Sequence, residues 1–182
     1  MTIMAAGMIR IFHIKRMLVA SFLLIISSWL QAGVEMNRFK NYTFWDFIEI
    51  IDQAMPLDKE NAEVLFDDQF IFSKQRGRYN EWRSQDLETK DGIVLDDITF
   101  VLNQNDSLSN GGFFHFNTKN QCLTLKNTKQ KVEGVVLHSG PKGRSLHDTS
   151  VWRASRSWGD IFFSFEVRDP DCLAYVTFKR PK

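Results

Sequence analysis

The sequence predicts an α+β protein in which helices pack on antiparallel sheet. Three observations support this class. Residues 43–55 carry an apolar stripe at helical spacing. Several later segments alternate apolar and polar residues with the period of two that is typical of a half-buried strand. Residues that favour tight turns separate these segments, as in Arg168-Asp169-Pro170-Asp171.

A targeting segment opens the chain. Residues 1–30 contain three basic residues and no acid, and they end in the apolar run 17–30, which is too short for a comfortable membrane span. Small residues follow this run. The order predicts a signal peptide over residues 1–32, cleaved after Ala32 or one residue later. The alternative that remains open is an uncleaved membrane anchor.

The remaining residues, 33–182, have the length of one domain. The leader carries three of the 23 basic residues and none of the 22 acidic ones, so this domain has a net charge of −2. That balance gives no reason to expect binding to nucleic acid or to an anionic membrane surface. We therefore expect a periplasmic or secreted protein that leaves the membrane after cleavage.

Two cysteines, Cys122 and Cys172, lie in the expected mature domain. Because they lack CxxC spacing and the compartment is oxidising, we expect them to form one structural disulfide. In the chain-entropy model such a loop closure contributes on the order of 4 kcal/mol. A catalytic or metal-binding thiol is the alternative, and it needs a histidine or basic partner that the local sequence does not show.

The first half of the domain is expected to hold two helices and four strands. Thr43 and Asp46 have the spacing of a capping box, and Pro56 limits how far that helix runs. A second helix is expected from the N-cap Asp58 to about Phe66. The strands are expected at 69–74, 79–85, 92–103 and 112–117.

The apolar positions in the third of these strands change parity at Asp96-Asp97, which predicts a bulge there. The second half is expected to hold a helix over 125–132 with Thr124 as its cap. Its strands are expected at 134–139 and 150–155, followed by the hairpin 158–178. In the first strand of that hairpin the apolar alternation has one exception, since Phe162 falls on the polar side.

The two halves share an order of elements, and each contains a Trp-Arg pair on its second strand. We therefore expect two helix–four-strand repeats, over 43–117 and 122–178. This layout is similar to that of the β-lactamase-inhibitory proteins, whose two helix-plus-sheet repeats form a concave surface that grips an enzyme. The likeness rests on the order of elements across 43–178, and no diagnostic motif accompanies it.

The candidate binding residues are Trp82, Arg83, Trp152 and Arg153. Tryptophan and arginine are enriched at binding hot spots, and both tryptophans have polar neighbours along their own strands. The alternative is that both rings pack beneath the helices. The loop 140–149 adds Lys142 and Arg144 beside glycines, as an exposed basic turn.

No metal site or cofactor is expected. The histidines of the mature domain, His115, His138 and His147, do not have metal-ligand spacing, and the acids Asp96-Asp97 lack the ligand order of a calcium loop. A hydrolase that uses His138, His147 or Asp148 is the alternative function. Against it, Ser145, His147 and Asp148 are crowded into one polar loop without a GxSxG motif.

From these observations we expect a non-enzymatic module that binds another protein, of the kind formed by inhibitors or immunity proteins that act on an exported toxin or hydrolase. An enzyme would show titratable groups converging in a deep pocket, whereas a binder would show a broad aromatic face.

Overall fold

The structure, a computed structural model, describes residues 41–103 and 112–180. The predicted signal peptide lies outside the described residues. The helices are α2 (Phe44–Ala54), α3 (Lys59–Phe66) and α4 (Leu125–Lys131). The strands of the first half are β1 (Ile71–Arg76), β2 (Tyr79–Arg83), β3 (Leu87–Glu88), β4 (Val94–Asn103) and β5 (Phe113–Lys119). Those of the second half are β6 (Val136–Ser139), β7 (Thr149–Arg156), β8 (Gly159–Glu166) and β9 (Leu173–Lys179).

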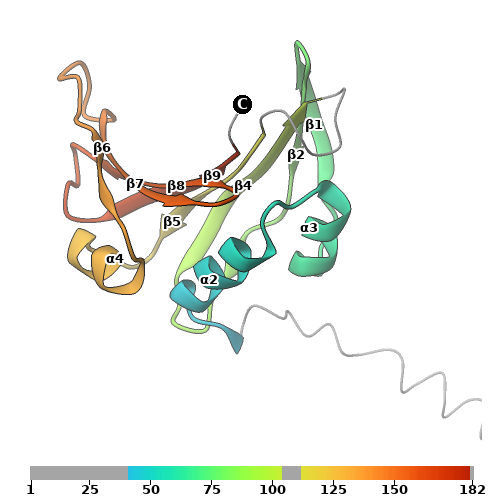
Figure 1. Cartoon of the computed structure of the whole chain (residues 1–182), viewed down its shortest axis with the longest axis horizontal. Helices are drawn as coiled ribbons and strands as arrows, with labels where there is room; N and C mark the ends of the chain where they lie inside the picture. Colours follow the sequence, from blue (N-terminus) through green and yellow to red (C-terminus); the bar gives the residue numbers. More distant parts are fainter. Residues whose placement is uncertain (1–40, 104–111, 181–182) are drawn as a thin grey trace, which may run out of the picture. The chain divides into compact units, whose positions relative to one another are not determined.

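All the strands join one antiparallel sheet, which confirms the α+β class with antiparallel sheet (Figure 1). The strand order is β1-β2-β4-β5-β9-β8-β7-β6, and the short β3 pairs with β4. In each half the first strand lies at an edge of the sheet and the last strand lies at the centre, where β5 pairs with β9. The repeat relationship between the halves stays a prediction.

The three helices begin at the caps that the sequence predicted. Thr43 and Asp46 form the full capping box of α2, Asp58 accepts a hydrogen bond from the Asn61 N–H at the start of α3, and Thr124 caps α4. The N–H of Phe44 also donates to the Asp91 carboxylate at 3.0 Å. This contact ties the first turn of α2 to the turn before β4, so it positions the helix on the sheet.

The core lies between the helices and one face of the sheet, which we call the helix face. On α2, Phe47 contacts Phe116 of β5, with ring centroids 5.5 Å apart, and on α3, Phe66 contacts Phe114 at 5.1 Å. One row of paired residues crosses seven strands on this face: Phe72, Trp82, Phe100, Phe114, Phe178, Ile161 and Ala154. Five of these seven residues are almost fully buried, and the other two, Trp82 and Phe72, lie toward the β1 edge.

On the helix face, hydrogen bonds also connect α2 to the second half of the domain. Asp52 of α2 accepts hydrogen bonds from Arg156 Nε at 2.6 Å and from Trp158 Nε1 at 2.8 Å. The Trp158 ring stacks on Phe178 with centroids 6.2 Å apart. One carboxylate of the first helix therefore holds the turn between β7 and β8.

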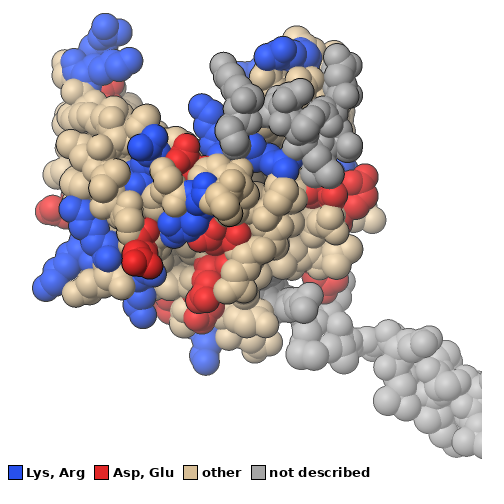
Figure 2. All heavy atoms as spheres, in the orientation of Figure 1, with Lys and Arg blue, Asp and Glu red and all other residues tan. Residues whose placement is uncertain are grey.

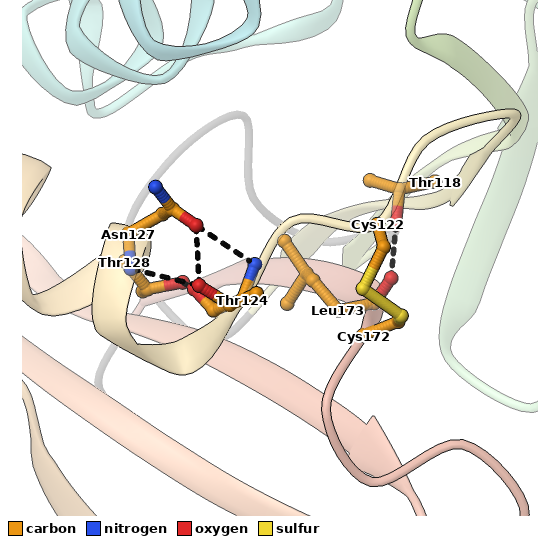
Figure 3. The surroundings of a disulfide bond; sticks show 7 residues. All are labelled: Thr118, Cys122, Thr124, Asn127, Thr128, Cys172 and Leu173. Atoms are coloured by element: carbon orange, nitrogen blue, oxygen red, sulfur yellow. Dashed lines mark hydrogen bonds between the residues drawn. A yellow bond between two sulfur atoms is a disulfide. The ribbon is translucent and has the colours of Figure 1, made fainter.

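Cys122 and Cys172 are bonded to each other, as predicted, with their Cα atoms 4.7 Å apart (Figure 3). The bond joins the segment before α4 to the start of β9. Beside it, the Leu173 N–H donates to the Leu123 carbonyl at 2.9 Å, and Thr118 Oγ1 donates to the Leu173 carbonyl. The disulfide thus fixes α4 against the central strands.

Several boundaries differ from the sequence prediction. β1 begins two residues later than expected and extends to Arg76, and β3 was not predicted.

The predicted bulge is present, since the β4–β5 register shifts between Asp96 and Thr99, and Asp97 has a φ of 49°. No helix in the described ranges is long and apolar enough to cross a membrane.

Candidate functional site

The face of the sheet opposite the helices, which we call the open face, carries the candidate site. None of the described helices packs on it (Figure 1). Figure 1 shows that the sheet curves, so that the β1–β2 and β6–β7 hairpins rise on the side away from α2 and α4. Within the folded unit, the open face therefore lies between two raised hairpins, with β5 and β9 at its centre.

One uninterrupted row of paired residues crosses the open face from β1 to β6, and we call it the central row. Residues directly opposite in an antiparallel pair share a face, so the strand register identifies its members. They are Ile71, Arg83, Thr99, His115, Thr177, Phe162, Arg153 and Val136. Exposed aliphatic residues end the row on both sides, and an arginine stands one strand inward from each end.

His115 occupies the middle of the central row. Its Nδ1 lies 2.9 Å from Thr177 Oγ1, its Nε2 lies 3.3 Å from Asn117 Oδ1, and its ring lies 5.1 Å from that of Tyr175. Burial lowers the pKa of His115, and this effect outweighs the hydrogen bond that the imidazole donates to Asn117 and the charges of Asp96 and Asp97, which raise that pKa. The imidazole is therefore neutral at pH 7 and forms part of a polar, aromatic centre.

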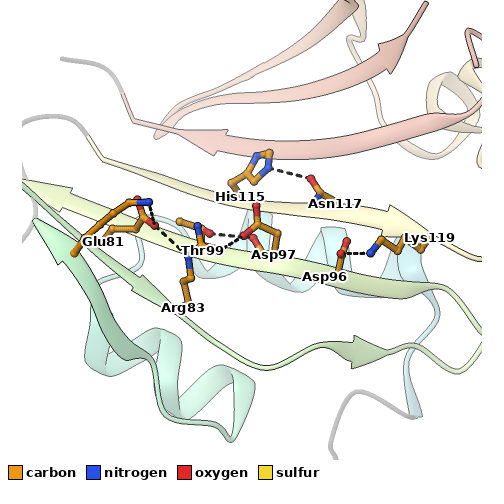
Figure 4. A network of polar contacts seen from close by, with 9 residues as sticks. Glu81, Arg83, Asp96, Asp97, Thr99, His115, Asn117 and Lys119 are labelled. Carbon is orange, nitrogen blue, oxygen red and sulfur yellow. Dashed lines mark hydrogen bonds and ion pairs between the residues drawn. The ribbon is translucent and has the colours of Figure 1, made fainter. Parts of the chain in front are cut away.

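Ion pairs order the β2–β4 side of the open face (Figure 4). Arg83 bridges Glu81 at 3.1 Å and Asp97 at 2.8 Å, and Lys119 pairs with Asp96 beyond the bulge. Burial raises the pKa of Glu81, but hydrogen bonds from Lys74 and Arg83 outweigh it and hold that pKa below its usual value. The bulge at Asp96-Asp97 thus has a local role, because it aims Asp97 at Arg83.

The β7–β8 side is less fully paired. Arg153 lies 3.8 Å from Asp160, and its buried Nε has no hydrogen-bond acceptor among the described residues. Next to it in the central row, Phe162 contacts the His138 ring with centroids 5.2 Å apart. Arg153 therefore has one buried N–H without an acceptor beside an aromatic pair.

The structure separates the four residues that the Trp-Arg pattern singled out. Trp82 and Trp152 lie on the helix face, where both pack against the core, whereas Arg83 and Arg153 lie on the open face. Trp152 lies opposite Phe163 in the β7–β8 register, and Lys129 Nζ of α4 lies 4.0 Å from the centroid of its ring. The tryptophans and arginines do not form one aromatic and basic surface, because neighbouring residues of a strand point to opposite faces.

The loop between β6 and β7 carries Lys142 and Arg144, and both are exposed. The β1–β2 hairpin carries Arg76 and Arg78 at its tip, and these are also exposed. Figure 2 shows basic residues at the upper ends of both raised parts, with a hollow between them. None of these four cations has an acidic partner within the described parts of the chain.

Two cavities lie at opposite ends of β5 and β9. One has a volume of about 600 Å³ and adjoins the disulfide; Lys119, Glu166 and Arg168 line it, and each has an ion-pair partner. The other, which we call the basic pocket, has a volume of about 330 Å³. Its lining is Arg76, Tyr79, Glu81, Val101, Gly112, Phe113, Lys179 and Arg180.

The residues of the alternative hydrolase reading do not form a catalytic arrangement. Ser145 Oγ accepts a hydrogen bond from the backbone N–H of His147, and Asp148 accepts one from the backbone N–H of Arg144. The His147 ring is exposed and lies 3.4 Å from Glu166. Ser145 and Asp148 thus hold the loop in shape, and His138 lies apart from them on Phe162. The described residues contain no group of three or more His, Cys, Asp or Glu that could hold a metal ion.

Sequence reasoning missed the centre of the open face. The exception at Phe162 was a local signal for it, since an aromatic residue on the polar side of a strand indicates that this side is more than a solvated surface. His115, between the buried Phe114 and Phe116, is a second position of this kind.

No protein-family model, no curated protein and no solved structure matches this chain.

Proposed function

We propose that this protein is a non-enzymatic module that binds another protein through its open face. The central row carries this proposal, because it runs across eight strands and no described helix packs on it (Figure 1). Seven strand spacings of about 4.8 Å give the face a width of roughly 34 Å. Five residues along each strand give a length of roughly 17 Å, hence an area of roughly 580 Å².

That area approaches the roughly 800 Å² that each partner buries in a stable complex, and the raised hairpins supply more. The composition also fits. Aromatic and arginine side chains are enriched at interfaces, and the open face has Phe162, Tyr175, Arg83 and Arg153.

Charge indicates the kind of partner. The tips on both sides of the hollow carry Arg76 and Arg78, and Lys142 and Arg144, none paired with a described acid. On the floor, by contrast, Arg83 and Lys119 are neutralised by neighbouring acids. We infer a partner with acidic groups at its edges and a less charged centre, since complementary potentials speed association and select partners.

We further propose that the protein is exported and acts on an exported toxin or hydrolase as an inhibitor or immunity-type protein. The disulfide supports an oxidising compartment, and the apolar leader supports secretion. The mature protein should begin at Gly33 or Val34. Intact mass of protein recovered from the host tests this, and a full-length chain in the membrane would contradict it.

Capture from an extract of the host's cell envelope tests the binding function. The bait is the whole mature protein, either wild-type or carrying Arg83→Gln with Arg153→Gln. The matched control is Lys126→Gln with Lys131→Gln, two exposed cations of α4. We expect the open-face variant to lose the partner, since truncating a hot spot costs about 2 kcal/mol, roughly 30-fold in affinity. A partner that the control loses, or that both variants retain, would contradict the proposal.

A further inference from the structure

The basic pocket has the chemistry of a site for an organic acid. It lies on the open face, at the end where the β1–β2 hairpin approaches β4, β5 and β9. Its volume of about 330 Å³ is at the lower end of the range for small-ligand sites, so it can accept one group of side-chain size.

Three cations and one acid line this pocket. The acid, Glu81, is committed to Lys74 at 3.2 Å and to Arg83 at 3.1 Å, neither of which lines the pocket. Arg76 and Lys179 have no carboxylate partner among the residues that the structure describes. Asp160, which faces Lys179 across the β8–β9 pair, instead accepts a hydrogen bond from Ser155 at 2.8 Å.

The wall between these cations is apolar. Val101 is nearly buried, Phe113 is 37% exposed, and Tyr79 is half-buried. Gly112 lets the chain lie close to β4, since a Cβ there would come within 2.5 Å of the Val101 carbonyl oxygen. The Gly112 carbonyl accepts a hydrogen bond from the Arg180 N–H at 3.2 Å, which holds the end of β9 beside the pocket.

We propose that the basic pocket binds a carboxylate attached to an apolar group, and that the partner protein supplies it as an acidic residue or chain end next to an apolar side chain. Arginine and lysine hold the carboxylate with charge-assisted hydrogen bonds, while Phe113 and Val101 bury the apolar part. This inference rests on the proposed function, because it identifies the group by which the partner is anchored. A free organic acid offers the same chemistry without a partner.

The first experiment tests the pocket by itself. The full mature protein is titrated with N-acetylphenylalanine, with its neutral amide and with inorganic phosphate, and the amide resonances of Gly112 and Phe113 are followed by NMR. We expect the acid to bind, and the neutral amide and phosphate to bind at least tenfold more weakly. Equal binding of the amide would overturn the role of the charge, and equal binding of phosphate would overturn the role of the apolar wall.

Variants assign the binding to named residues. Arg76→Gln with Lys179→Gln should weaken N-acetylphenylalanine binding at least tenfold, whereas the control Lys126→Gln with Lys131→Gln, two exposed cations of α4, should not change it. An unchanged melting temperature shows that each variant is folded. If the Arg76/Lys179 variant binds the acid as wild-type does, the inference is wrong.

The second experiment distinguishes the source of the carboxylate. The captured partner should bind the Arg76/Lys179 variant at least tenfold more weakly, and free N-acetylphenylalanine should compete with it. Partner binding that depends on Arg83 and Arg153 but not on the pocket would overturn this inference and leave the proposed function standing. The converse result is that the pocket binds the free acid while the Arg83/Arg153 variant captures the same proteins as wild-type. That result would contradict the proposed function and the partner as the source of the carboxylate, and would leave a pocket that binds a free organic acid.

Discussion

Replacing Trp152 with alanine should destabilise the fold and leave the open face intact. The ring is half-buried on the helix face, where it lies between Leu137 and Phe163 across the strands and beneath Lys129. A fully buried tryptophan costs about 3–5 kcal/mol when truncated, so we scale the cost here to about 2–3 kcal/mol. The lost cation–π contact adds about 0.5–1 kcal/mol.

A total near 3 kcal/mol corresponds to a fall in melting temperature of roughly 6–12 °C for a domain of this size. Thermal unfolding followed by circular dichroism measures it. Arg153→Gln is the matched control, because the neighbouring residue points to the other face and its exposed ion pair contributes at most about 1 kcal/mol. A Trp152→Ala protein that melts within 2 °C of wild-type, yet no longer binds its partner, would refute the placement of the ring in the core.

Three further predictions concern stability. Reducing the Cys122–Cys172 disulfide, which spans a sequence separation of 50, should lower the free energy of unfolding by about 4 kcal/mol. Urea denaturation with and without reductant measures this loss, and an unchanged midpoint would contradict a stabilising role of the bond. Asp52→Ala should lower the free energy of unfolding by roughly 2–3 kcal/mol, because it leaves the Arg156 and Trp158 donors unpaired. The exposed control Glu49→Ala should lower it by less than about 0.5 kcal/mol. Equal effects of the two variants in thermal denaturation would contradict the role of Asp52 in joining α2 to the β7–β8 turn. The pKa of His115 is lowered in the folded state, so the unfolded chain takes up a proton first as the pH falls below about 6.5. Stability should therefore fall as the pH drops below about 6.5, and His115→Gln should flatten that part of the profile. A wild-type profile that is already flat there would show that the imidazole is not buried.

Local signals in the sequence predicted the elements well. Capping patterns depend on residues three apart, so Thr43, Asp58 and Thr124 located the helix starts. The bulge at Asp96-Asp97 also leaves a local signal, because one inserted residue moves the side chains that follow it to the other face of the sheet, and the apolar alternation changes parity there.

The environment of the tryptophans could not be predicted in this way. Along its own strand Trp82 has the polar neighbours Asn80 and Ser84, which suggested an exposed ring. Its nearest neighbours on the same face come from other strands, Phe72 from β1 and Phe100 from β4. Cross-strand register decides burial in a sheet, and a single strand does not contain it.

The candidate site depends on register even more strongly. Arg83 and Arg153 are 70 positions apart in the chain, and they enter one row only because β5 and β9 pair at the centre of the sheet. Likewise, the basic pocket combines the tip of β1 with the end of β9. Neither juxtaposition leaves a sequence motif, which is why pattern reasoning found the arginines but not the surface that they share.

Site-specific photo-crosslinking in the host tests the central claim, that the open face is the binding surface, most directly. Benzoylphenylalanine replaces Arg83 or Arg153 on the open face, and Glu60 of α3 or Lys126 of α4 on the opposite side as controls. After irradiation, adducts are separated by mass and the attached protein is identified. The account predicts an adduct with the same protein from both open-face positions and none from α3 or α4. Adducts formed from the helix positions, with none from Arg83 and Arg153, would contradict it.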